Sequence, residues 1–179
     1  MRTVYFHEDD YCQCEVLPLA AKEYCLREMG DIDAFAEEHK EGQFYTDIYM
    51  REGSPHTLRE LALRSQQFTS ALDFLPAFDR VETGYSSYRE ECKAICARGF
   101  SNELAVFWDT DEEGFVTALW LVIWVKVENA DTVRRIYTAL GSLAPLLLAD
   151  WNQSDCVDLT DSAAIEQYLQ EQLHTDNTI

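Results

Sequence analysis

Hydrophobic and polar positions alternate or recur at helical spacing along most of the chain, and these patterns predict a series of short elements. Residues 2–6 and 11–17 are predicted to be strands on either side of a charged turn. Apolar side chains four residues apart predict a helix that begins after Pro18 and ends at Gly30. The other elements predicted in the first half are a short helix at 31–40, a strand at 44–50 and a helix start at Ser54–Pro55.

The stretch 56–75 fits two descriptions. Its leucine and phenylalanine positions suit one long helix, whereas two of its leucines also suit a short strand, followed by a shorter helix that Ser65 caps. Further along, Ser87 and Glu90 have the spacing of a capping box, in which each side chain bonds the backbone N–H of the other residue. We therefore expect a helix at 87–99, which a glycine ends.

The second half carries the clearest patterns. Strands at 104–108 and 115–127 flank the acidic turn 109–114 and should form a hairpin. Because both faces of 115–127 are apolar, we expect a central strand that is covered on both sides. The remaining predicted elements are a helix that ends at Gly141, strands at 146–150 and 156–159 joined by the turn 151–154, and a final helix capped by Asp161.

These elements predict an α+β fold, with a mostly antiparallel β-sheet and helices packed on it. No linker rich in Gly, Pro or Ser interrupts the chain, so residues 1–179 are expected to form a single globular α+β domain. The net charge is −19, from 14 basic and 33 acidic side chains. A hydrophobic content of 47% nevertheless favours a folded core over a disordered acidic chain.

The excess of acidic side chains argues against two kinds of partner. Affinity for DNA or RNA comes from cations that neutralise phosphates, so we expect no binding to nucleic acid and none to an anionic membrane surface. The longest apolar run, 118–125, has eight residues, whereas a transmembrane helix needs about 20. The first residues also lack the apolar stretch of an export signal, and we expect a cytoplasmic protein.

The six cysteines are expected to be free thiols, because disulfides concentrate in exported proteins. A zinc site could combine Cys12 and Cys14 with Cys92 and Cys96, since thiolates one helical turn apart can reach the same ion. Neither spacing is that of a zinc knuckle, and the neighbouring positions are apolar, where a thiol packs as a small hydrophobic side chain. We expect core thiols, with no metal and no cofactor.

Other motifs that carry chemistry are weak. The acidic turn 109–114 imitates the first six positions of a calcium loop, but Trp120 stands where the loop needs a bidentate Glu. A solvated hairpin turn is therefore expected there. The sequence contains no nucleophile elbow, phosphate-binding glycine loop or zinc-protease motif. Trp120 and Trp124 share one face of their strand and are expected in the core rather than in a ligand pocket.

Charge is distributed unevenly along the chain. Arg135 is the last basic residue, and the 44 residues after it contain seven acidic side chains. We expect this C-terminal unit to bind a partner, with Trp151 as an aromatic anchor. The aspartates that should steer a basic protein, together with an amide beside the anchor, are Asp150, Asn152, Asp155, Asp158 and Asp161.

A small, strongly acidic α+β chain without a catalytic motif is similar in profile to bacterial immunity proteins, which cover a basic toxin domain with complementary charge. The similarity is one of class and rests on no matching motif. It implies a non-enzymatic binding protein for a basic macromolecular partner. Two alternatives stay open: a small hydrolase-like enzyme based on a Cys or a carboxylate pair, and an acidic surface that serves only solubility or salt adaptation.

Overall fold

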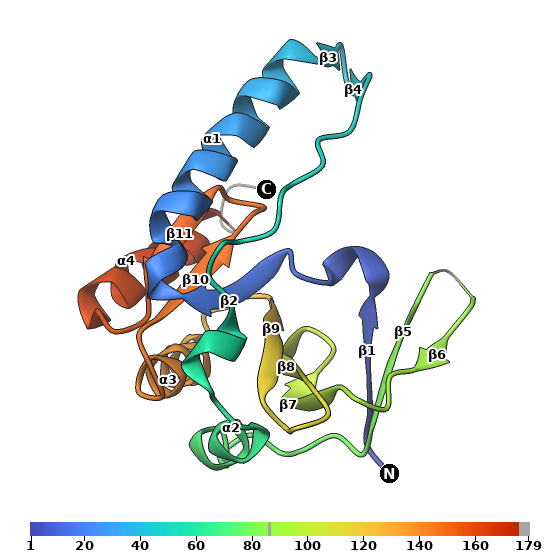
Figure 1. The fold of residues 1–179 in the computed structure, drawn as a ribbon, viewed down its shortest axis with the longest axis vertical. Helices are drawn as coiled ribbons and strands as arrows, with labels where there is room; N and C mark the ends of the chain where they lie inside the picture. The colour runs from blue at the N-terminus through green and yellow to red at the C-terminus, as the bar shows by residue number, and fades with distance from the viewer. Residues whose placement is uncertain (86, 176–179) are drawn as a thin grey trace.

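The computed structural model describes residues 1–85 and 87–175 and has an α+β fold (Figure 1). The helices in these residues are α1 (Lys22–Glu38), α2 (Ser65–Ala71), α3 (Ala130–Gly141) and α4 (Ser162–Thr175), with short 3-10 helices η1 (Glu8–Asp10), η2 (Leu19–Ala21) and η3 (Leu58–Leu61). The strands are β1 (Thr3–His7), β2 (Cys14–Pro18), β3 (Lys40–Glu41), β4 (Phe44–Tyr45), β5 (Arg80–Gly84), β6 (Glu90–Glu91), β7 (Cys96–Ser101), β8 (Leu104–Thr110), β9 (Val116–Ile123), β10 (Leu146–Asp150) and β11 (Asp155–Asp158).

Strands from both halves of the chain meet in a six-stranded sheet of order β11-β10-β2-β9-β8-β7. Every neighbouring pair in it is antiparallel, and β2 pairs with β10 along its whole length. A smaller sheet, β1-β5-β6, is mixed, because β1 and β5 run parallel. β3 and β4 form a separate hairpin at the end of α1 (Figure 1).

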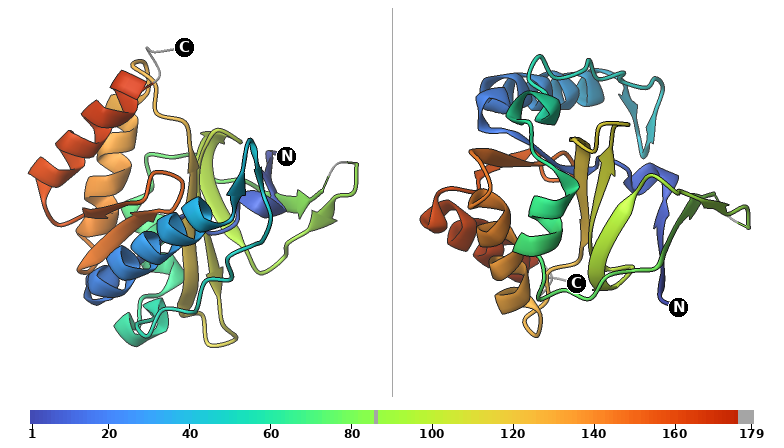
Figure 2. Two further views of the ribbon diagram at one scale, coloured as in Figure 1. Left: turned by 90° about the horizontal axis from the view of Figure 1, so that it is seen from above. Right: turned by 60° about the horizontal axis from the view of Figure 1, so that its bottom comes forward.

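The two faces of the six-stranded sheet are covered differently. On one face, α2, α3, α4 and η3 pack against side chains such as Leu121 of β9 and Leu148 of β10. The opposite face is shared, since α1 covers β2 and β10 while the smaller sheet covers β8 and β9 (Figure 2). Because side chains alternate along a strand, Leu147 and Leu148 enter different cores. The same alternation decides which side of the sheet each candidate site residue reaches.

The structure confirms most of the elements predicted in the second half. β8 and β9 form the expected hairpin, and β9 lies between β2 and β8 with both faces covered, Leu121 on one side and Trp120 on the other. The helix ending at Gly141 and the β10–β11 hairpin are present as predicted. Trp124 differs from the prediction, because it follows the end of β9 and its side chain is 60% exposed.

Two helix predictions in the first half are wrong. The region 87–99 contains β6 and most of β7 instead of a helix, and Glu90 pairs with Thr83 of β5 rather than forming a capping box. Gly99 lies within β7, where a Cβ atom would overlap the backbone of β8. Helix α1 continues through Gly30 to Glu38 instead of ending at the glycine. In both regions tertiary packing outweighs the local signal.

Several boundaries also differ from the predictions. The strand expected at 44–50 shrinks to β4, and no helix begins at Ser54–Pro55, since the next helical turn is η3. Within 56–75 the structure is closer to a short strand followed by a shorter helix than to one long helix. Arg64 forms an isolated β-bridge with Phe115, and α2 begins at Ser65. The Ser65 hydroxyl accepts a hydrogen bond from Trp108 Nε1 at 2.8 Å.

The strand predicted at 11–17 is shorter in the structure and begins only at Cys14. Within residues 1–85 and 87–175, no helix combines the length and the apolar character needed to cross a membrane. Asp176, one of the acidic residues of the C-terminal unit, lies outside the described residues.

Candidate functional site

The residues predicted for partner binding lie along the β10–β11 hairpin and at the start of α4, in two groups. Asp150 and Asp155 are register partners at the turn end of the hairpin. Asp158 pairs with Leu147 instead, three strand positions or about 10 Å away, and Asp161 follows it. The residues that share the turn end are Asp150, Trp151, Asn152 and Asp155. The four aspartates therefore do not form one cluster around the tryptophan.

Asp158 and Asp161 shape the connection between β11 and α4. The Oδ1 atom of Asp158 accepts hydrogen bonds from the backbone N–H of Thr160 at 2.8 Å and from its hydroxyl at 2.7 Å. The Oδ1 atom of Asp161 accepts from the N–H of Ala163 at 2.9 Å and so caps the first turn of α4. Both carboxylates thus have a structural role that needs no partner.

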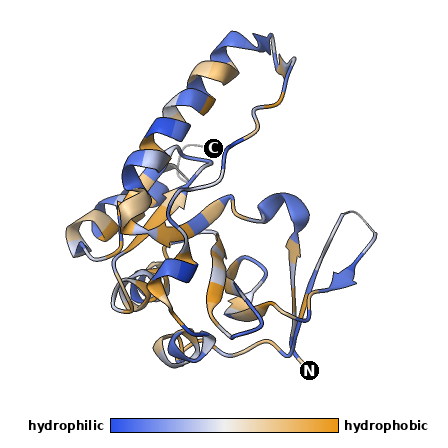
Figure 3. Ribbon diagram, viewed as in Figure 1, coloured by the Kyte–Doolittle hydropathy of each residue, from blue (hydrophilic) through white to orange (hydrophobic). Residues whose placement is uncertain are grey.

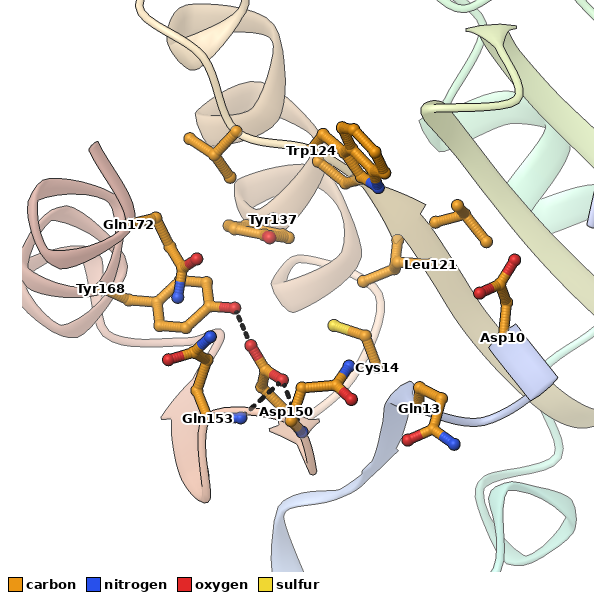
Figure 4. A pocket seen from close by; sticks show the side chains of 14 residues that line it. Asp10, Gln13, Cys14, Leu121, Trp124, Tyr137, Asp150, Gln153, Tyr168 and Gln172 are labelled. Carbon is orange, nitrogen blue, oxygen red and sulfur yellow. Dashed lines mark hydrogen bonds between the residues drawn. The ribbon is translucent and has the colours of Figure 1, made fainter. Parts of the chain in front are cut away.

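Asp150 is buried, with 6% of its surface exposed, and its carboxylate lies in a pocket between the sheet, α3 and α4 (Figure 4). Its Oδ1 atom accepts hydrogen bonds from the backbone N–H groups of Asn152 at 3.0 Å and Gln153 at 3.2 Å. Its Oδ2 atom accepts from the hydroxyl of Tyr168 on α4 at 2.6 Å. Three donors replace part of the water that burial removes, and they fix the orientation of the carboxylate.

The Asp150 pocket has a volume of about 320 Å³. Cys14 of β2 and Tyr137 of α3 join Asp150 on its lining, and aliphatic side chains of β9 form a wall. Trp124 and the amide side chains of the lining stand around these groups (Figure 4). Sequence reasoning found Asp150 but missed the tyrosines, because the apolar spacing that places Tyr137 and Tyr168 on buried helix faces does not show where their hydroxyls point.

Two titratable groups of this pocket, the Cys14 thiol and the Tyr137 phenol, are held in their neutral forms. Burial raises the pKa of the Cys14 thiol and of the Tyr137 phenol well above their ordinary values, and the charge of Asp150 adds to both effects. A neutral thiol is a poor nucleophile, and the described lining contains no histidine that could deprotonate it. The Cys14 thiol is therefore not activated as a nucleophile in this pocket.

Trp151 packs with the core beneath α1, on the other side of the sheet from the Asp150 pocket. Its Nε1 atom donates a hydrogen bond to Glu15 Oε1 at 2.8 Å, and the guanidinium carbon of Arg51 lies 3.9 Å from the centroid of the indole ring. Arg51 also pairs with Glu15 at 3.0 Å. Burial raises the pKa of Glu15, and Arg51 opposes the shift. The indole is half-buried by partners that come from distant parts of the chain.

The other candidate groups do not assemble into a site. Cys12 lies before β2 in a left-handed conformation, with φ 56°, and burial raises its pKa to about 12. Cys92 contributes to the core under the smaller sheet, whereas Cys96 is exposed on β7. Among the described residues, no three His, Cys, Asp or Glu side chains are grouped so that they could hold a metal ion.

In the acidic turn 109–114, the Asp111 carboxylate accepts a hydrogen bond from Arg59 at 2.6 Å.

A second feature, which we call the acidic arm, comprises residues 31–52. The second half of α1, the β3–β4 hairpin and the segment that returns towards the sheet form this projection (Figure 1). It carries seven acidic and two basic side chains, and it is mostly hydrophilic with hydrophobic positions on the returning segment (Figure 3). Four large apolar side chains of the arm are between 62% and 82% exposed, namely Phe44, Tyr45, Ile48 and Met50. The pattern at 44–50 predicts an ordinary strand and does not show that these side chains are exposed.

Three kinds of comparison bear on this geometry. Neither the models of protein families, nor the curated proteins, nor the solved structures contain a match to the chain. The function is therefore inferred from the sites themselves.

Proposed function

We propose that the protein is a non-enzymatic binding protein for a basic macromolecular partner, of the toxin-immunity type, and that this partner docks on the acidic arm. The observation that carries the proposal is the exposure of four large apolar side chains within the seven residues 44–50. Single exposed apolar residues are normal on a protein surface, whereas a contiguous patch rimmed by polar groups is typical of an interaction site.

The charge of the arm selects a basic partner. Its two basic side chains are both engaged, since Lys40 lies 4.0 Å from Glu37 and Arg51 pairs with Glu15. The remaining carboxylates produce a negative field around the apolar patch. Such a field raises the association rate of a cationic protein. It disfavours a second copy of this chain and a nucleic acid, because both carry negative charge.

A cleft of about 480 Å³ between α1 and the returning segment offers a place for a basic side chain. Glu28 is only 4% exposed there and accepts a hydrogen bond from the hydroxyl of Tyr49 at 3.3 Å. Asp31 and Glu52 add two carboxylates to the lining, and Arg27 is its one basic residue. A long Lys or Arg side chain could pack its alkyl stem on the apolar wall of the cleft and place its charge among the carboxylates.

The turn end of the β10–β11 hairpin borders the arm. The hydroxyl of Ser154 donates a hydrogen bond to Asp33 of α1 at 3.2 Å, and Trp151 contacts Arg51 of the returning segment. Asn152 follows Trp151 in the chain and is exposed. Our proposal therefore includes Asn152 as the edge of the docking surface, whereas Asp150 and its register partner Asp155 lie on the face of the sheet opposite α1 and outside that surface.

The test uses a labelled amphipathic helical peptide made of Lys and Leu, with a peptide of Glu and Leu as its charge-reversed counterpart. The arm is altered by the double substitution Phe44→Ser and Ile48→Ser. The matched control is Phe100→Ser with Val127→Ser, which removes two apolar side chains that are also more than half exposed but lie outside the arm. We expect the arm variant to bind the basic peptide about tenfold more weakly or worse, and the control to bind like the original protein.

Thermal unfolding of both double variants shows whether they keep the fold, as exposed positions should allow. Equal loss of binding in the two variants would overturn the proposal, because the contact would then not depend on the arm. Equal binding of the acidic and basic peptides would also overturn it, because charge would not select the partner. Once a natural partner is identified, it should dissociate faster from the arm variant than from the control variant.

A further inference from the structure

We infer that the Asp150 pocket is a binding site for a small organic cation, whose ammonium or guanidinium group pairs with the Asp150 carboxylate. This inference is independent of the acidic arm and of its partner. The pocket lies on the face of the sheet covered by α3 and α4, whereas α1, which carries the arm, covers the opposite face. A protein docked on the arm would not supply the ligand, so we assign a free small molecule.

The negative charge of Asp150 has no countercharge on the described lining of the pocket. The described lining contains no lysine, arginine or histidine, and its second carboxylate, that of Asp10, is also negative. Removing a carboxylate from water is costly unless opposite charge and hydrogen bonds compensate for it. Asp150 has hydrogen bonds from three neutral donors but lacks the opposite charge. A bound cation would supply it.

The Asp150 carboxylate has room for a further hydrogen bond. A carboxylate offers about four acceptor positions, and Asp150 uses three, two on Oδ1 and one on Oδ2. One position on Oδ2 is therefore free for a donor from the pocket. Ammonium and guanidinium groups carry only donors, and their hydrogen bonds to a carboxylate are among the stronger ones in proteins.

Tyr137 is 1% exposed and lines the pocket, close enough to Asp150 for the charge of the carboxylate to act on its phenol. A phenol oxygen can accept a hydrogen bond as well as donate one. The hydroxyl of Tyr168 donates to Asp150, which leaves its oxygen able to accept. Two phenol oxygens next to one carboxylate can therefore receive further N–H groups of the same cation.

The walls fit the organic part of such a ligand. Leu121, Ile123 and Val125 offer aliphatic surface for an alkyl chain, and the ring of Trp124 stands at the edge of the same space (Figure 4). Aromatic faces attract cations, and the Trp124 ring already has the Lys126 ammonium 5.9 Å from its centroid. A volume of about 320 Å³ is at the lower end of ligand pockets, which suits a small molecule.

The probes are four compounds with alkyl chains of three or four carbons and different head groups: butylammonium, butylguanidinium, butanol and butyrate. Binding is followed by NMR through the indole N–H of Trp124, and the intact protein is used throughout. We expect saturable binding of the two cations, with dissociation constants of about a millimolar or below, and no saturable binding of butanol or butyrate. Saturation by butanol at the same concentrations would overturn the inference, because charge would then play no part.

The variants locate the contact. Asp150→Asn keeps the shape of the side chain and should weaken binding of the cations at least about tenfold. Asp158→Asn is the matched control, because it neutralises a carboxylate of the same hairpin that lies about 10 Å along the strand from the turn end and does not line the pocket, and it should leave the affinity unchanged. Unchanged affinity in folded Asp150→Asn would overturn the inference. If that variant fails to fold, Tyr137→Phe decides instead, and an affinity for butylammonium equal to that of the original protein would overturn it.

A last experiment distinguishes a free small-molecule ligand from a side chain of another protein. Nα-acetyl-arginine amide carries the same guanidinium group on a segment of peptide backbone. We expect butylguanidinium to bind at least as tightly, because the pocket is small. Binding of the arginine amide alone would overturn the assignment of a free small molecule.

Discussion

Asp150 and Asp155 face each other across the β10–β11 hairpin, yet only Asp150 is buried. Residues in register on an antiparallel pair share one face of the sheet, with Cβ atoms about 5 Å apart. Asp150 receives hydrogen bonds from Tyr168 and from two backbone N–H groups, whereas Asp155 Oδ1 accepts one from its neighbour Cys156 at 2.7 Å. The two carboxylates are chemically alike but differ in what their loss would do.

We predict that neutralising Asp155 and neutralising Asp150 change the stability of the protein in opposite directions. Asp155→Asn removes a like charge opposite Asp150 and keeps an oxygen for the N–H of Cys156, so stability should rise by up to about 1 kcal/mol. Asp150→Asn weakens the bonds from three buried donors and should lower stability by about 1.5–3 kcal/mol. Urea unfolding of the two variants measures both changes. A loss of stability in Asp155→Asn would contradict the pairing described here.

Substituting two glycines by alanine should also change the stability in opposite directions. Gly30 is exposed within α1 and has no atom within 4 Å of a Cβ position, so Gly30→Ala should stabilise the protein by about 0.5–1 kcal/mol. Gly141 ends α3 against the backbone of Leu159, which a Cβ would overlap, so Gly141→Ala should destabilise it by about 1–3 kcal/mol. The free energies of unfolding distinguish the two. Stabilisation by both substitutions would mean that α3 does not approach Leu159 so closely.

Trp151 allows a stepwise test. Trp151→Phe keeps a ring against Arg51 but removes the N–H that bonds the largely buried Glu15, which should cost about 1.5–3 kcal/mol of stability. Trp151→Ala also removes the packing and should cost more. Chemical denaturation of both variants checks the order. That Trp151 also anchors a partner stays a prediction, and the dissociation rate of Trp151→Phe tests it separately from stability.

The protein should lose stability at alkaline pH. Burial raises the pKa values of Cys14, Tyr137 and Tyr168, and it raises those of Cys12 and Tyr24 to about 12. Unfolded thiols ionise near pH 8.5 and phenols near pH 10, so the unfolded state releases these protons first, at about those values. The stabilising contribution is complete below that range and declines as pH rises through it.

Unfolding curves recorded from about pH 7 to pH 11 check this, since Tyr137→Phe should reduce the alkaline loss. The control is Tyr45→Phe, which alters an exposed tyrosine of the arm. An identical pH dependence in Tyr137→Phe and the original protein would contradict the burial of the Tyr137 phenol.

The thiols should differ in their rates of modification. Cys96 is exposed, whereas Cys25 is fully buried in the core beneath α1. Iodoacetamide should therefore modify Cys96 first and Cys25 last, because access limits the reaction of a buried thiol. Peptide mapping by mass spectrometry at successive times gives the order. Early modification of Cys25 would show that α1 separates readily from the sheet.

The accuracy of the sequence-based prediction follows the strength of the pattern. The strands at 115–127 and 146–150 could be predicted because long apolar runs have few alternatives in a folded chain. The helix at 87–99 was predicted from a capping box and a closing glycine, and a cap contributes only about 1 kcal/mol. Pairing of β6 with β5 and of β7 with β8 outweighs that contribution. A local signal of this size cannot compete with two strand pairings.

The candidate sites were less predictable than the fold for a related reason. Uneven charge drew attention to the hairpin and to Asp150, but the burial of Asp150 depends on Tyr137 and Tyr168, which α3 and α4 bring to it. The half-burial of Trp151 likewise depends on Arg51, one hundred positions away in the chain. Such neighbours are fixed by packing and not by spacing along the sequence.

The position of β2 next to β10 has a consequence for synthesis. About 130 residues separate the two strands, and at about 5–20 residues per second a ribosome needs roughly 6 to 25 seconds to make them. The β7–β8–β9 meander can form during that interval because its strands are consecutive. β2 must wait with an unpaired edge towards β10, so the nascent chain exposes an aggregation-prone strand until its last quarter emerges.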